Sequence, residues 1–178
     1  MHSAEEPALS GSEWIVLSLL CEGPMHGNAV SHLVGPDGDL GQIWRVARAA
    51  VYRSLDRLSD LGLIRSAGEE FSPHGPVRLL FTATEAGQAA ATSWQQRPVR
   101  HTRDIRSELL VKLALLHRRG ADPHELLVAQ HALLVPIISA LEDRMATAIG
   151  FDHALLLWRY ETASAAVRFL DALAPTPP

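Results

Sequence analysis

Residues 46–61 carry charged, aromatic and small side chains at spacings that predict a basic face on a short helix. Val51, Leu55 and Leu58 recur at helical intervals and predict its buried side. The side chains that fall near the opposite side are Arg48, Ala49, Tyr52, Arg53 and Asp56. Arginine pairs with phosphate or guanine, and small alanines let a helix approach closely, so this face suits a DNA major groove. The alternative is a solvated surface helix, and periodicity alone does not separate the two.

Positive charge is concentrated around this predicted helix, although the 178-residue chain has a formal net charge of −4. Residues 1–40 contain six acidic residues and no lysine or arginine, whereas residues 41–106 contain ten arginines and six acidic residues. Residues 107–178 contain six basic and eight acidic residues. The local field decides whether a phosphate backbone is attracted, so a nucleic-acid partner remains compatible with the total. The overall acidity predicts modest, salt-sensitive affinity.

Two further helices are predicted before this one. Ser10-Gly11-Ser12-Glu13 is an S-x-x-E pattern directly before an apolar run, which predicts a capping box and a helix over residues 11–21. Glu22-Gly23-Pro24 ends it, and a second short helix follows over residues 26–34, with His26 at its start. Residues 35–39 are predicted to form a turn.

A β-hairpin is predicted after the three helices, with no strand before it. Residues 63–66 and 77–83 have strand character, and Gly68, Pro73, Gly75 and Pro76 lie in the long segment between them. Three helices followed by a hairpin is the order of a winged helix-turn-helix. In that fold the third helix enters the groove and the hairpin lies beside the DNA backbone.

The composition shifts beyond about residue 90, where a basic segment over residues 97–106 precedes three helical runs. Gly120 ends the first run, and Asp122 and Pro123 are predicted to be the cap and the first helical position of the second. Pro136 is expected to interrupt or kink the second run. The third spans about residues 152–173, and one side of it carries Leu155, Trp158, Ala165, Phe169 and Leu173.

These apolar stripes are too wide for one helical hairpin to bury alone. The simplest partner surface is the same region of a second subunit, and a self-contained three-helix bundle is the alternative. The sequence therefore predicts a mainly α fold with a small β-hairpin. Residues 8–92 are predicted to form a winged helix-turn-helix DNA-binding domain and residues 100–174 a helical dimerisation domain.

Several segments resemble the PadR family of transcriptional regulators in their order and spacing. They are Leu-Leu-Cys-Glu-Gly-Pro-Met-His-Gly at residues 19–27, Val-Tyr-Arg-Ser-Leu-Asp-Arg-Leu at 51–58 with Gly-Leu-Ile at 62–64, and Phe-Thr-Ala-Thr-Glu-Ala-Gly at 81–87. Residues 103–113 are similar to the opening of the helical domain in longer members. The resemblance implies a winged-helix domain, a helical dimerisation domain, and usually repression relieved by a small molecule or another signal.

Carried over by position, the resemblance also implies which residues face DNA. These are Arg48, Ala49, Tyr52 and Arg53 on the third helix, and the wing residues from His74 to Arg78 on the flanking backbone.

The chain departs from the family pattern at three places. Asn28 stands where an aromatic residue is frequent, Ala47 stands where a serine usually caps the third helix, and the wing carries Glu69 and Glu70 with few basic residues. An alanine cap lacks the side-chain oxygen that accepts a backbone N–H, at a cost of about 1 kcal/mol.

Trp94 and Trp158 are the candidates for binding a small-molecule effector, because a flat ring at a dimer interface can stack on a planar molecule. Core packing is the alternative for both. His117, His124 and His131 recur every seven residues, but seven helical residues rise about 10 Å, whereas metal–nitrogen bonds are about 2 Å. No metal, cofactor or enzymatic activity is predicted, since no phosphate loop, nucleophile elbow, C-x-x-C or H-E-x-x-H motif is present.

A cytoplasmic location without membrane contact is expected. No apolar run approaches the length of about 20 residues that crosses a bilayer, and the N-terminus lacks the basic start of a signal peptide. Cys21 is the only cysteine, so no intrachain disulfide can form, and its apolar neighbours predict a packed thiol.

Two functions remain open from the sequence. The first is a homodimeric DNA-binding regulator, a repressor that reads a pseudo-palindromic operator in double-stranded DNA and responds to a small-molecule effector. The second is a helical protein-interaction adaptor that has a winged-helix shape but no useful DNA affinity.

Overall fold

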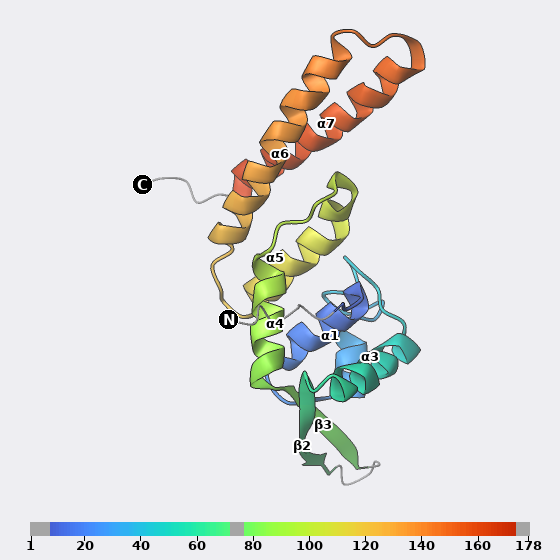
Figure 1. Ribbon diagram of the computed structural model, residues 1–178. Helices are drawn as coiled ribbons and strands as arrows, with labels where there is room; N and C mark the ends of the chain where they lie inside the picture. The colour runs from blue at the N-terminus through green and yellow to red at the C-terminus, as the bar shows by residue number, and fades with distance from the viewer. Residues whose placement is uncertain (1–7, 72–76, 174–178) are drawn as a thin grey trace.

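The computed structural model describes residues 8–71 and 77–173. It is mainly helical with a small antiparallel sheet, as the sequence predicts. The elements are α1 (Gly11–Leu20), β1 (Met25–His26), α2 (Gly27–Leu33), α3 (Arg48–Asp60), β2 (Ile64–Glu70), β3 (Arg78–Ala83), α4 (Glu85–Gln96), η1 (Thr102–Asp104), η2 (Ile105–Leu109), α5 (Leu110–Arg118), α6 (His124–Met145) and α7 (Gly150–Leu173). The helices α6 and α7 extend as an antiparallel pair from the end opposite the β2–β3 hairpin (Figure 1).

Helix α1 forms the centre of the winged-helix part. Its start is the predicted capping box, in which the Ser10 hydroxyl accepts from the Glu13 N–H and the Glu13 carboxylate accepts from the Ser10 N–H at 2.6 Å. Every residue from Trp14 to Leu20 is buried, so the helix has no solvent face over that length. The helices α3 and α4 pack against it.

The small sheet contains a strand that the sequence analysis missed. The strand order is β1-β3-β2, and Met25 and His26 of β1 pair with Phe81 and Leu80 of β3. The prediction that no strand precedes the hairpin is therefore wrong. A two-residue strand held by a distant partner leaves no periodic signal of its own.

The predicted hairpin is present, but β2 continues to Glu70, past the predicted end at residue 66. Its pairing with β3 contains one irregularity. The β2–β3 register shifts between Ser66 and Glu69, and Gly68 lies there with φ +104°. Glycine adopts that conformation without strain and marks β-bulges.

The buried apolar side chains form two clusters, and α5 contributes to both. Val111 and Leu115 pack in the first cluster with α1, α3 and α4, whereas Leu116 packs in the second with α6 and α7. Helix α5 therefore connects the winged-helix part to the C-terminal helices. Cys21 packs at the edge of the first cluster, and burial raises the pKa of its thiol to about 11, so it stays protonated at neutral pH.

Buried polar side chains hold the segment that leads into α5. The Lys112 ammonium is 2.9 Å from the Arg97 carbonyl oxygen, 2.7 Å from a Glu108 carboxylate oxygen and 4.7 Å from the centre of the Trp94 ring. The amide of Gln130 both accepts from the N–H of Val99 at 2.7 Å and donates to its carbonyl at 3.1 Å.

The C-terminal helices differ from the prediction at their starts. Residues 102–109 form a 3₁₀ turn and a π turn before α5, where one continuous helical run was expected. Helix α6 begins at His124 with Pro123 at the N-cap, one residue later than predicted, and the Asp122 carboxylate accepts from the His124 N–H at 2.9 Å. Pro136 does not interrupt α6, which is a single helix from His124 to Met145.

Helix α6 differs from the expectation that no apolar run approaches the length that crosses a bilayer. Within the described ranges it is the one helix long and apolar enough to cross a membrane by length and composition, with a mean hydropathy of 1.4 over its most apolar window. That measure is weak evidence, because helices in the cores of soluble proteins also meet it. Gln130 is buried inside the fold, and 28% of the window is buried, so much of this apolar helix lacks cover within one chain.

Replacing Gln130 with alanine is expected to lower the free energy of unfolding by about 1–3 kcal/mol, because the buried N–H and C=O of Val99 would lose their partner. Urea denaturation followed by circular dichroism measures the change. Gln88→Ala, an exposed change on α4, should stay within about 0.5 kcal/mol of the parent. Equal stabilities of the Gln130 variant and the parent would contradict the role given to this amide.

Candidate nucleic-acid interface

Helix α3 presents the predicted basic face to solvent. Val51, Leu55 and Leu58 are 0–2% exposed, as expected for the inward side. Arg48, Ala49 and Arg53 are exposed on the outward side, and Tyr52 is 42% exposed. The two faces of the helix are therefore as the periodicity predicts.

The arginines of α3 divide into free and paired side chains. Neither Arg48 nor Arg53 forms an ion pair with any residue that the structure describes. Arg57 instead lies 3.3 Å from a Glu13 carboxylate oxygen, which confirms that it is an intramolecular partner. Arg48 and Arg53 are thus the guanidinium groups of α3 that remain open to an external anion.

The start of α3 has no capping side chain, as the alanine at position 47 predicts. Ala47 is the N-cap residue, and no side-chain oxygen accepts from the first turn. The free N–H groups and the helix dipole favour a negatively charged group at this end. Arg48, the first residue of the helix, adds positive charge at the same place.

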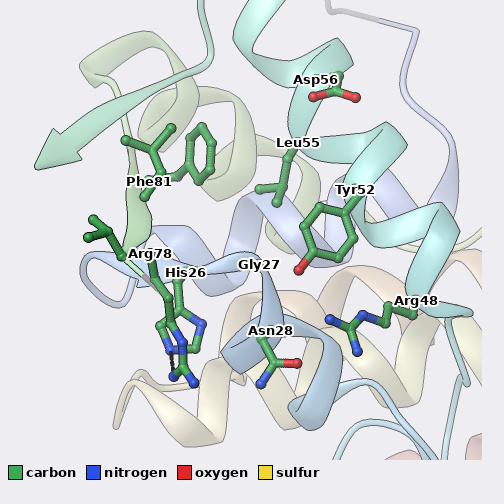
Figure 2. Close-up of a pocket in the computed structure, with 11 residues that line it drawn as sticks. His26, Gly27, Asn28, Arg48, Tyr52, Leu55, Asp56, Arg78 and Phe81 are labelled. Atoms are coloured by element: carbon green, nitrogen blue, oxygen red, sulfur yellow. Dashed lines mark hydrogen bonds between the residues drawn. The ribbon is translucent and has the colours of Figure 1, made fainter. Parts of the chain in front are cut away.

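Tyr52 packs its ring on the first residue of α2. A β-carbon added to Gly27 would lie 2.9 Å from a Tyr52 ring carbon and 3.0 Å from a Leu55 methyl carbon, so only glycine allows this approach. The Arg48 guanidinium lies 5.8 Å from the centre of the Tyr52 ring. Figure 2 shows the Tyr52 hydroxyl directed toward Gly27 and Asn28. The ring is held by packing while its polar end remains accessible.

A hollow of about 490 Å³ separates α3 from the wing. Its walls come from the start of α2, the outward face of α3 and the strand β3 (Figure 2). The polar residues that line it are His26, Asn28, Arg48, Tyr52, Asp56 and Arg78. Of the residues predicted to face DNA, Arg48, Tyr52 and Arg78 therefore border one concave surface, and Ala49 and Arg53 are not among its lining residues.

His26 connects α2 to both strands of the wing. Its Nδ1 accepts from the Ala29 N–H at 2.9 Å and so caps α2, as its predicted place at the helix start indicates. Its Nε2 lies 3.1 Å from an Arg78 guanidinium nitrogen and 3.2 Å from a Glu70 carboxylate oxygen. This contact with the wing was not predicted, because the two-residue strand β1, which brings His26 beside β3, has no periodic signal in the sequence. His74, the other predicted wing residue, lies outside the described residues.

The two tryptophans predicted to bind a ligand have different surroundings. Trp94 is 4% exposed and stacks on Trp14 with ring centres 5.5 Å apart and planes 3° apart. This is the core packing that the sequence analysis kept as an alternative. Trp158 is 71% exposed on α7. The structure therefore does not bring the two rings into one site within a single chain.

Residues 16–93 match the model of the transcriptional regulator PadR-like family. The chain contains a PadR-like domain. The matched residues run from the second half of α1 through most of α4. No curated protein matches the chain.

Solved structures of PadR proteins are similar to this chain. Bacillus subtilis PadR in complex with operator DNA is 21% identical over 92% of this chain and 97% of that one, with a TM-score of 0.46. The complex of the same protein with p-coumaric acid is 19% identical over 95% and 96%, with a TM-score of 0.43. A PadR-like transcriptional regulator from Bacillus cereus is 20% identical over 96% of both chains, with a TM-score of 0.42.

His26→Ala is expected to lower the free energy of unfolding by about 0.5–2 kcal/mol, because α2 loses its cap. His26→Asn should restore most of that loss, since asparagine is also a good N-cap residue, but its short side chain cannot contact the wing. Hydrogen exchange in β2 and β3 should therefore be faster in both variants, whereas urea denaturation should separate them. Unchanged exchange in the wing of both variants would contradict the connection through Nε2.

Proposed function

We propose that this PadR-like transcriptional regulator is a homodimeric repressor that binds a pseudo-palindromic operator in double-stranded DNA and is released by a small molecule or another signal. The observation that carries the proposal is the exposed face of α3, where Arg48 and Arg53 have no ion-pair partner within the described part of the chain. We assign Arg48, Ala49, Tyr52 and Arg53 to the major groove. Arg78 and His74 are assigned to the flanking backbone.

The local chemistry of α3 supports DNA as the partner despite the acidic total. The uncapped helix start and Arg48 together favour a phosphate, and exposed Ala49 leaves room for the helix to enter a groove. Arg53 has the reach to form paired hydrogen bonds with guanine. Arg78 is engaged with His26 and lies in register with Glu70, so the wing contributes less positive charge than α3 does.

The exposed side of α7 supports a second copy of the chain as the other partner. Phe151, Leu155 and Trp158 are 80%, 37% and 71% exposed and are spaced by four and three residues, the spacing of a helix-packing seam. Leu155 and Trp158 belong to the stripe predicted on this helix, and Phe151 lies one turn before them, whereas the residues that α7 buries are Leu156, Ala163, Ala166 and Leu170. Soluble monomers rarely expose large contiguous apolar patches. A twofold dimer would cover this seam and present two α3 helices to two half-sites.

The adaptor alternative has one observation in its favour, the negative charge of the wing. Glu69 and Glu70 are both exposed on β2, the outer strand of the sheet, and would repel a phosphate backbone that came close to them. Binding to DNA and its dependence on salt distinguish the two functions directly.

Arg53→Ala and Tyr52→Ala are each expected to weaken operator binding by roughly 5- to 150-fold, because each removes a contact to a base or a phosphate. Gel-shift titration against the DNA upstream of the protein's own gene measures the effect. Arg57→Ala is the matched control on the same helix, since Arg57 pairs with Glu13, and its affinity should change by less than about 3-fold. Sedimentation must show that all three variants keep the parent's oligomeric state. Equal affinity of the parent for operator and random duplex would favour the adaptor.

Trp158→Glu is expected to convert the dimer to a monomer at micromolar concentration, because it places a charge in the apolar seam. Arg159→Glu, at the next exposed position, should remain dimeric. Sedimentation velocity reads the assembly and circular dichroism checks the helices, which should persist because Trp158 is 71% exposed in the single chain. A parent protein that is monomeric at micromolar concentration would refute the dimer.

A further inference from the structure

The last turn of α5 carries an arginine that connects three parts of the chain. The Arg118 guanidinium donates from Nε to one carboxylate oxygen of Glu22 at 2.8 Å and from Nη2 to the other at 2.7 Å. Its Nη1 lies 3.6 Å from a carboxylate oxygen of Asp39. Glu22 lies in the turn after α1, and Asp39 lies in the segment that joins α2 to α3. One side chain therefore joins α5 to two segments of the winged-helix part.

The contact with Glu22 is the stronger of the two. Paired hydrogen bonds between a guanidinium and a carboxylate have a defined geometry and are stronger than neutral hydrogen bonds. The side chains of Arg118 and Glu22 are 23% and 14% exposed, so this pair is partly shielded from water and salt. The Asp39 side chain is 82% exposed, and its longer contact contributes little by itself. The Arg118–Glu22 pair therefore holds the end of α5, and Asp39 marks where that end meets the segment before α3.

The segment between α2 and α3 is compact, so a contact with it is also a contact with the start of α3. Leu40 is 0% exposed and Val46 is 4% exposed in the first hydrophobic cluster. The Val46 N–H donates to the Val34 carbonyl at 3.0 Å, which closes the segment on itself. The next residue, Ala47, is the N-cap of α3. Asp39 therefore lies on a unit whose position is fixed relative to α3.

The contact at Arg118 is polar, and it can open while the hydrophobic attachment of α5 remains. Val111 and Leu115, which attach this helix to the first cluster, are both 0% exposed and precede Arg118 in the helix. Water can replace each partner of the Arg118–Glu22 pair without any exposure of these apolar side chains. The end of α5 then loses its fixed direction relative to α3, although both parts stay folded.

We propose that Arg118 is a positioning residue for DNA binding, which fixes the end of α5 against the winged-helix part and so sets the separation of the two α3 helices in the dimer. This inference rests on the proposed function as a DNA-binding homodimer. A dimer whose α3 helices are held at one separation binds both half-sites without first ordering the helices, which increases its affinity for the complete operator. A single half-site contacts only one α3 helix, so its binding does not depend on Arg118.

Gel-shift titration with altered operators tests this role. Arg118→Gln is expected to weaken binding to the complete operator by at least about 5-fold, because the two α3 helices lose their fixed separation. The variant should also lose the parent's preference for the native operator over one with extra base pairs between the half-sites. Its affinity for a duplex with a single half-site should stay within about 2-fold of the parent. Arg119→Gln, an exposed change of the same charge at the next position, is the matched control and should bind every duplex as the parent does.

Two results of this titration would overturn the inference. The first is an unchanged affinity and spacing preference in Arg118→Gln. The second is an equal loss of affinity for the complete operator and the single half-site, because that would indicate a damaged winged helix and not a lost separation. Sedimentation velocity must show that the variant keeps the parent's oligomeric state.

Exchange of the two charges provides a rescue test. Glu22→Arg and Arg118→Glu should each weaken binding to the complete operator, because each places like charges together. The double variant restores an ion pair at the same place and should recover most of the lost affinity. A double variant that binds no better than the single variants would separate the effect of Arg118 from its contact with Glu22 and overturn the assignment.

Hydrogen exchange without DNA separates this inference from the proposed function. Arg118→Gln should increase exchange by at least about 5-fold at residues 117–121 and at residues 34–46, and leave α6 unchanged. Unchanged exchange in both segments, in a protein whose parent binds operator, overturns the inference and leaves DNA binding intact. A parent that binds no duplex overturns the proposed function, whereas faster exchange in the variant still supports the structural contact at Arg118.

Discussion

Helix α5 is buried by two hydrophobic clusters at once, and this constraint fixes how the winged helix meets the C-terminal helices. Val111 and Leu115 insert into the first cluster, and Leu116 inserts into the second. The Lys112 ammonium between them is 1% exposed, and a buried charge is tolerated only when it is well bonded. Because Glu108 and the Arg97 carbonyl supply those bonds, the segment from residue 97 to α5 has one low-energy arrangement.

The position of the exposed face of α3 relative to α2 depends on close packing at a glycine rather than on polar contacts. Gly27 lets the ring of Tyr52 lie on α2, and the ring in turn stands beside Arg48. The wing is tied to the same place, since His26, the residue before Gly27, caps α2 and contacts Arg78. The groove-facing side chains are therefore positioned by the junction of β1 and α2, which itself contributes little charge.

The sequence predicted the features that are local and missed those that depend on distant segments. The capping box of α1, the two faces of α3 and the pairing role of Arg57 all follow from spacing along one helix. The strand β1 and the contacts of His26 with the wing need β3, about 55 residues away, and leave no periodic trace. The burial of Trp94 required Trp14, whose position relative to α4 no local pattern specifies.

On helix α7, the apolar stripe predicted from the sequence is not the face that is buried within one chain. Its apolar residues are dense enough to form two faces, and α6 can cover only the one that includes Leu156 and Leu170. The face predicted from the sequence, with Trp158 and Phe169, is the other one, so its apolar character must be explained by something outside the α6–α7 pair. The C-terminal half of this face lines a hollow together with the π turn. One apolar face of a single helix therefore includes both the exposed residues near Trp158 and the wall of an open hollow, so a molecule that contacts either part acts on the position of the same helix.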